Sequence, residues 1–165
     1  MLLATCCALA GCPGQLDRDA SIPDWSFKGK LGYRTPSGSG SVRIDWRQFP
    51  KERFDIVLRA ALGLGVARVE GSADGPVTLV QRGERVEFAD PSTAAAEALG
   101  VAVPLAALRH WVRGEAAPAP HVATEGGLSQ AGWEVQFTRR PDGLPSRVVM
   151  RRGDVRFVLA VRDWL

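Results

Sequence analysis

Hydrophobic and polar positions alternate with a period of two through most of the chain. In residues 42–47 a valine, an isoleucine and a tryptophan alternate with two arginines and an aspartate. Such alternation gives a β-strand one apolar face and one wet face. Further strands are predicted near 25–33, 54–59, 66–71, 77–81, 85–88, 133–137, 147–151 and 155–161. Together these segments predict a meandering antiparallel sheet with one apolar face.

The period changes in the middle of the chain. Asp90 followed by Pro91 is typical of a helix N-cap with proline at the first helical position, and an alanine-rich segment at 92–99 then ends at Gly100. A second short helix is predicted from about Pro104 to Gly114. Its apolar stripe consists of Leu105, Leu108, Trp111 and Val112. Residues 36–40 predict a turn, and residues 116–127, rich in Pro, Ala and Gly, predict a loop.

The order of strands, two helices and strands predicts a mainly β (α+β) fold. An antiparallel sheet with one apolar face must close on itself or be covered. We therefore expect a half-open antiparallel β-barrel with the short helices as a lid over an apolar interior. Periodicity does not distinguish a filled barrel from a hollow one, and the patterning favours a filled one. A hollow one would suit acyl chains. The residues predicted to line the interior are Phe27, Leu31, Ile44, Trp46, Phe54, Ile56, Leu58, Leu105, Leu108 and Trp111.

Composition places the chain among globular proteins. It has 165 residues, 45% hydrophobic and 24% charged, so one ordinary domain is expected rather than a disordered segment. The net charge of +3 is compatible with an anionic membrane surface or partner, although a solvated basic face is the simpler interpretation. The arginines are spread singly along the strands and do not form the continuous stripe expected of a nucleic-acid-binding protein.

All three cysteines lie in the first twelve residues, at Cys6, Cys7 and Cys12. The body of the protein therefore has no disulfide framework, zinc site or thiol active site. Residues 9–12, Leu-Ala-Gly-Cys, follow a short apolar run and match a lipobox, the cleavage and acylation site of bacterial lipoproteins. We predict that residues 1–11 are a lipoprotein-type signal peptide and that Cys12 is lipidated.

Residues 12–24 are then a lipidated N-terminus and tether ahead of a domain over 25–165. The tether allows a reach of at most ~45 Å from Cys12 to Trp25. The residue after the lipidated cysteine is Pro13. In many Gram-negative bacteria Asp at this position favours retention in the inner membrane, so this signal permits export to the outer membrane.

The sequence offers little for an enzyme. There are two histidines, of which His110 lies on the polar flank of the second helix and His121 in the predicted loop. Serines occur in turns, without the Gly-x-Ser-x-Gly context of a nucleophile elbow. The glycines near 63–65 lack the third glycine and the helix of a dinucleotide site. We therefore predict no catalytic residues, no metal and no cofactor.

The connection between the third and fourth predicted strands is unusually apolar. Residues 60–65 read Ala-Ala-Leu-Gly-Leu-Gly, where a hairpin tip normally carries polar residues. Leu62 and Leu64, with Gly63 between them, either fold back into the core or stay exposed for a partner or a membrane. The sequence pattern leaves these alternatives open.

Several motifs resemble the LolB family of outer-membrane lipoprotein receptors along nearly the whole chain after Cys12. The most specific matches Leu99-Gly100-x-x-x-Pro104-Leu105-x-x-Leu108-x-x-Trp111-x-x-Gly114. Shorter ones, in the family's order, are Trp25-x-Phe27-x-Gly29-Lys30-Leu31-Gly32, Trp46, Leu62-Gly63, Gly132-Trp133-x-Val135, Leu144-Pro145-x-Arg147 and Trp164.

The resemblance implies a periplasm-facing monomer, anchored by lipid in the outer membrane. Its apolar cavity would accept the acyl chains of lipoproteins from the soluble carrier LolA and deliver them to outer-membrane phospholipid without a cofactor. The family's functional leucine at the tip of a protruding loop aligns with Leu62, which implies that Leu62, Gly63 and Leu64 form a membrane-insertion loop. The tip differs from relatives that have Pro before this leucine.

Two other functions fit the same pattern. A soluble LolA-like carrier would share the fold, and lipidation of Cys12 is the discriminating feature, because a shuttle cannot be tethered. A lipoprotein scaffold of an outer-membrane assembly machine would have a filled barrel and a protein-binding face. A third class, a lipid-modifying hydrolase, lacks a credible nucleophile and base.

Overall fold

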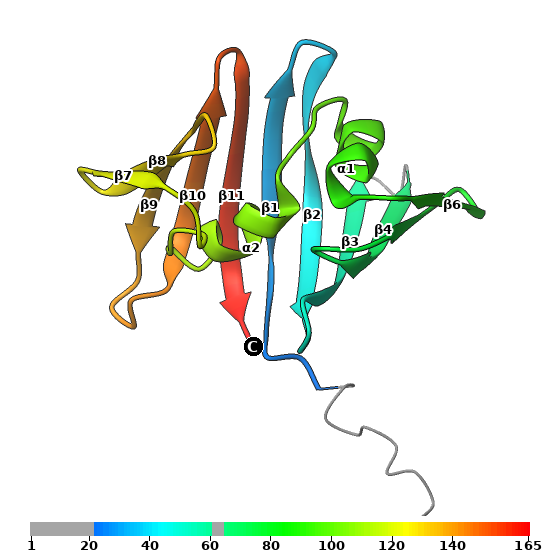
Figure 1. Ribbon diagram of the computed structural model, residues 1–165, viewed down its shortest axis with the longest axis horizontal. Coiled ribbons are helices and arrows are strands. Elements are labelled where there is room, and N and C mark those ends of the chain that lie inside the picture. The colour runs from blue at the N-terminus through cyan, green and yellow to red at the C-terminus, as the bar shows by residue number, and fades with distance from the viewer. Residues whose placement is uncertain (1–21, 61–64) are drawn as a thin grey trace, which may run out of the picture.

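Eleven antiparallel strands form one curved sheet in the computed structural model, which describes residues 22–60 and 65–165. The strands are β1 (Trp25–Thr35), β2 (Gly38–Gln48), β3 (Arg53–Ala60), β4 (Val66–Ser72), β5 (Val77–Gln81), β6 (Glu84–Phe88), β7 (His121–Thr124), β8 (Gly127–Gln130), β9 (Trp133–Arg139), β10 (Pro145–Arg152) and β11 (Val155–Trp164). Their order in the sheet is β6-β5-β4-β3-β2-β1-β11-β10-β9-β8-β7. Because β6 and β7 are the two free edges, the sheet stays open, and the predicted half-open barrel is confirmed (Figure 1).

Two short helices cover the concave side of the sheet, as the sequence predicts (Figure 1). Helix α1 (Pro91–Leu99) begins at Asp90, whose carboxylate accepts hydrogen bonds from the backbone N–H groups of Ser92 and Thr93 at 2.9 and 3.0 Å. It ends at Gly100, whose φ of 71° is the left-handed conformation that glycine adopts without strain. Helix α2 (Leu105–Trp111) follows, and α1 contacts α2, β4, β5 and β6.

Two sequence predictions about turns and loops were wrong. The segment 116–127 is not a continuous loop, because it contains β7 and the first residue of β8. All four residues of β7 are exposed, so neither face carries the apolar positions that reveal a strand. The predicted turn at 36–40 is also shorter: the strand β2 already begins at Gly38, and only two residues separate it from β1.

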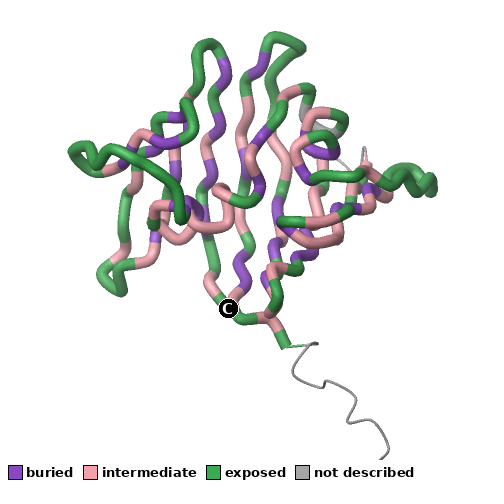
Figure 2. Tube along the Cα trace, in the orientation of Figure 1, coloured by how far each residue is buried: buried purple, intermediate pink, exposed green. Residues whose placement is uncertain are grey.

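Buried residues recur along the strands and in both helices (Figure 2), and their side chains form one hydrophobic core. On one side Trp111 of α2 packs on Trp133 with ring centroids 6.3 Å apart, and Trp133 packs on Phe157 at 5.8 Å. At the end of the sheet where the chain enters β1, Phe27 packs against Trp46 and Trp164 at 6.0 and 5.2 Å. These aromatic rings fill the interior around a remaining small space under α1 and α2.

Candidate functional site

The remaining space is an apolar cavity of about 60 Å³ between strands β1–β4 and the two helices. Every side chain around it is a hydrocarbon or an indole, so the cavity offers burial and no charged group to a ligand. The lining residues are Leu31, Ile44, Trp46, Ile56, Leu58, Val69, Ala95, Leu105 and Leu108. Seven of the ten residues predicted to line the interior are therefore brought together around one space.

The other three predicted residues, Phe27, Phe54 and Trp111, are buried in the same hydrophobic core but do not line the cavity. Trp111 instead turns towards β8 and β9, where its indole N–H donates to the side-chain oxygen of Gln130 at 2.8 Å. Two residues that line the cavity were not predicted from the sequence. Val69 stands at an alternating position of β4, and Ala95 lies in the alanine-rich helix, where small size hides a core position.

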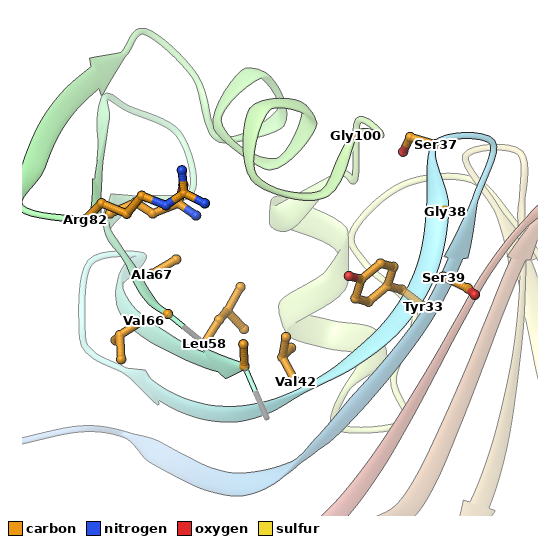
Figure 3. Close-up of a pocket in the computed structure, with 13 residues that line it drawn as sticks. Tyr33, Ser37, Gly38, Ser39, Val42, Leu58, Val66, Ala67, Arg82 and Gly100 are labelled. Carbon is orange, nitrogen blue, oxygen red and sulfur yellow. The ribbon is translucent and has the colours of Figure 1, made fainter. Parts of the chain in front are cut away.

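A wider pocket of about 470 Å³ lies next to the cavity, at the end of the sheet formed by the β1–β2 hairpin. Leu58 lines both spaces, so it marks the boundary between the wider outer pocket and the narrow interior. Figure 3 shows Leu58 and Val42 on the floor of the outer pocket, Tyr33 at its β1–β2 side and Arg82 across from them on the β5–β6 turn. The outer pocket is thus polar at its rim and apolar where it meets the interior.

The volume of the inner cavity decides what it holds in this conformation. Sites for small molecules typically enclose ~300–1,000 Å³, so about 60 Å³ is too little for an acyl chain. The structure is therefore a closed form with a nearly filled barrel, as the patterning favoured. An acyl chain enters the interior only if α1, α2 or the side chains beneath them shift.

Helix α2 is held to the sheet on both flanks. Arg109 forms an ion pair with Glu52 of the β2–β3 turn, and Trp111 is tied to Gln130 on the other side. Gln130 is 3% exposed, and its amide also accepts from the N–H of Ala117 and donates to the carbonyl of Ala119, both at 2.9 Å. A buried amide whose oxygen and nitrogen both have hydrogen-bond partners fixes the end of the helix in one position.

His110 lies in a charged cleft beside this ion pair. The cleft, of about 410 Å³, is lined by Arg109 and His110 of α2, by Arg113 just after the helix, and on the facing turn by Lys51 and Glu52. Burial, reinforced by the Arg109 charge, lowers the pKa of His110 below its ordinary value of 6.5. Its Nε2 atom is buried and finds no hydrogen-bond partner within residues 22–60 and 65–165. His110 is thus half-buried rather than solvated, and its lowered pKa favours the neutral imidazole at pH 7.

The remaining predicted site residues, Cys12, Leu62, Gly63 and Leu64, lie outside the described residues. Within the part of the chain that the structure describes, no cluster of three His, Cys, Asp or Glu side chains is placed to hold a metal ion. Of the described helices, neither has the length and hydropathy needed to cross a bilayer.

Comparison with known proteins identifies the family to which the chain belongs. The family model described as "Outer membrane lipoprotein LolB" matches residues 23–164, which include both helices and every strand. The chain belongs to the LolB family. The resemblance drawn from the sequence motifs is thereby confirmed.

Relatives named outer-membrane lipoprotein LolB align along most of their own length. The protein of Alkalilimnicola ehrlichii is 37% identical over 161 residues, which cover 90% of this chain and 80% of the relative. That of Chromohalobacter salexigens is 33% identical, with 99% and 85% covered. That of Pseudomonas putida strain W619 is also 33% identical, with 94% and 90% covered. The LolB match thus contains the cavity and the outer pocket, whereas Cys12 precedes it.

Proposed function

We propose that the protein is an outer-membrane-anchored receptor that accepts lipoproteins from the periplasmic carrier LolA and inserts them into the outer membrane. Membership of the LolB family supports the receptor role and the location. The observation that carries the proposal is the apolar cavity beneath α1 and α2, which shares Leu58 with the outer pocket. No covalent step and no cofactor is involved.

The acyl chains of the cargo enter through the outer pocket and displace the contacts that close the interior. Each methylene group moved from water to an apolar environment contributes about 0.8 kcal/mol, so several chains offset the cost of shifting the helices. Leu105 and Leu108 move with α2, whereas Ile44, Ile56 and Leu58 stay on the sheet. Transfer from carrier to receptor then requires only that the open receptor holds the chains more tightly than the carrier does.

The lipidated cysteine and the delivery loop lie outside the described ranges. Residues 1–11 serve as the signal peptide, Cys12 carries the lipid, and residues 12–24 tether the domain of 25–165. Two or more acyl chains on one cysteine give stable membrane attachment. The protein acts as a monomer. Leu62, with Gly63 and Leu64, inserts into phospholipid when cargo is released, because a leucine at a hairpin tip gains about 1.5–3 kcal/mol on burial.

A transfer experiment in solution tests acceptance by itself. A Cys12→Ala form of the chain, exported behind a cleavable signal, is mixed with LolA loaded with a triacylated lipoprotein, and the two proteins are separated by affinity tag. We expect the lipoprotein to leave LolA and to appear on the receptor, whereas the same lipoprotein without acyl chains stays unbound. If acylated cargo remains on LolA, or if the non-acylated form binds equally, the chain is a protein-binding scaffold and not an acyl-chain receptor.

A further inference from the structure

Three cations stand directly beside one another across the outer face of the sheet. In the strand register Lys30 of β1 pairs with Arg43 of β2, and Arg43 pairs with Arg59 of β3. All three are exposed, and their neighbours Leu31, Ile44 and Leu58 line the inner cavity, so the cations point to the opposite, convex side. Like charges directly opposite in a sheet are unfavourable, so this cationic row lowers stability.

A second row of like charge lies farther along the same face. Arg156 of β11 pairs with Arg34 of β1 on one side and with Arg151 of β10 on the other. Arg34 is four residues beyond Lys30 on the same strand, which places the two rows about 13 Å apart. The positive charge therefore extends over five neighbouring strands rather than being confined to one pair.

Acidic residues compensate the cations elsewhere on this face but not in the cationic row. Lys28 pairs in register with Asp45 and with Asp163. Asp55 bonds to Arg68 at 2.8 Å and also to Arg47. By contrast, within the described ranges 22–60 and 65–165 no carboxylate forms an ion pair with a member of the cationic row.

The cationic row borders a hollow of about 740 Å³. Its floor contains Gly29 and Ala160, at an irregularity in the pairing of β1 with β11. A Cβ atom at Gly29 would meet the carbonyl oxygen of Ala160 at 2.4 Å, so the close approach of the two strands excludes any larger residue. The hollow thus has a low floor and a rim of long cationic side chains, with Asp45 the one acidic side chain along its lining.

We propose that this face binds the phosphate groups of anionic phospholipids at the membrane surface. Because its floor is formed by a glycine and an alanine, the hollow has room for a compact anion. The lysine and arginine side chains at its rim are long and flexible enough to reach successive headgroups. Each cation near an anionic bilayer adds one weak favourable contact, so the row acts as a set of such contacts. This inference goes beyond the proposed receptor function and does not depend on it.

The chemistry of the face favours lipid over an acidic protein. Protein interfaces are centred on aromatic or other large apolar anchors, and lysine is depleted from their cores. Between the two cationic rows the outward positions carry Val149, Val158, Gly32 and Ser41, which offer no such anchor. A headgroup layer needs none, because it presents many phosphates and no fixed shape.

Binding to vesicles tests the proposal, with the Cys12→Ala form exported behind a cleavable signal so that neither an acyl anchor nor the apolar residues 1–11 contribute. Phosphatidylcholine vesicles with and without phosphatidylglycerol are sedimented with the protein at fixed ionic strength. The chain is compared with a Lys30→Ser/Arg43→Ser/Arg59→Ser variant. The matched control, Arg85→Ser/Arg113→Ser/Arg140→Ser, removes three positive charges at exposed or half-buried sites away from the row. Thermal melts establish that both variants fold.

We expect the row variant to bind vesicles with phosphatidylglycerol at least about tenfold more weakly, while the control changes by less than about threefold. Vesicles of phosphatidylcholine alone should bind weakly and equally to the Cys12→Ala protein and to both triple variants. Equal binding by the two variants overturns the proposal. So does loss of binding in millimolar inorganic phosphate, which would make free phosphate the ligand, or binding of soluble polyglutamate in preference to vesicles, which would make an acidic protein the partner. The transfer assay in solution contains no vesicles, so it tests the receptor function separately.

Discussion

The indole N–H of Trp111 donates a 2.8 Å hydrogen bond to the side-chain oxygen of Gln130, and this bond joins the end of helix α2 to strand β8. The two residues are 0% and 3% exposed, so the bond is made without water. Leu105 and Leu108, which line the cavity, lie on the same short helix. The position of the cavity's cover therefore depends on a polar contact formed in the other half of the barrel.

Replacing Gln130 should destabilise the fold. In Gln130→Leu the N–H of Trp111, the N–H of Ala117 and the carbonyl of Ala119 lose their shared partner inside the protein. We expect the free energy of unfolding to fall by about 2–4 kcal/mol, measured by urea denaturation. Gln136→Leu, at an exposed position of β9, is the control and should change it by less than about 0.5 kcal/mol. Equal effects would show that the Gln130 bonds do not hold α2.

Stability should fall in mild acid because of His110. Its pKa is lowered in the folded state, so the unfolded chain takes up this proton first as pH drops below about 6.5. The neutral histidine thus contributes stability that is present above pH 6.5 and is lost progressively as pH falls towards the lowered folded-state pKa. In His110→Gln the loss of stability between pH 7.5 and pH 5 should be smaller, measured by denaturant unfolding at each pH. His121→Gln, at an exposed site, should retain the full loss.

The sequence predicts the strands and helices well where the local signal and the tertiary environment agree. The Asp90–Pro91 start and the Gly100 end of α1 depend on neighbouring backbone groups alone, so they can be read directly. The alternation in β2 reflects burial on one face, which the structure confirms for Ile44 and Trp46. Strand β7 has no buried face, and its strand character comes only from pairing with β8.

The direction in which a core side chain points is harder to predict from the sequence than the fact that the residue is buried. Trp111 shares the apolar stripe of α2 with Leu105 and Leu108, yet it turns away from the cavity because Gln130 offers its indole a partner. Gln130 occupies an inward position of β8 where an apolar residue is expected, and a single polar residue in a short strand gives no pattern to interpret. The Arg109–Glu52 pair likewise joins residues distant in sequence.

Delivery of cargo should depend on Leu62. Leu62→Glu removes the apolar contact with the bilayer and places a charge near hydrocarbon, which is unfavourable. We expect this variant to accept lipoprotein from LolA normally but to release it poorly into liposomes, whereas Leu62→Ile behaves like the original protein. A thermal melt, a transfer assay and a liposome incorporation assay on one sample distinguish effects on folding, on acceptance and on delivery. Unfolding would make Leu62 a core residue, and normal incorporation would make the loop a simple turn.

A larger side chain at position 58 should block the entry of acyl chains from the outer pocket into the cavity. Leu58 is half-buried and lines both spaces, so Leu58→Trp narrows the passage without forcing a larger side chain into a filled core. We expect acceptance of lipoprotein from LolA to fall at least about tenfold, a change of about 1.4 kcal/mol. Val57→Trp, one residue earlier on the outer face of β3, is the matched control and should accept cargo normally. Equal acceptance by both variants would place the entry route elsewhere.

Photochemical crosslinking from helix α2 tests most directly that acyl chains occupy the interior. A benzophenone amino acid is introduced at Leu108, which lines the cavity, or at Ala106, which is exposed on the same helix. Each variant receives from LolA a lipoprotein with radiolabelled acyl chains and is then irradiated. We expect a labelled adduct from Leu108 and none from Ala106, and we expect the adduct to be lost when the Leu58→Trp substitution is added. Adducts of equal yield from both positions, or none from Leu108 while cargo is bound, would contradict it.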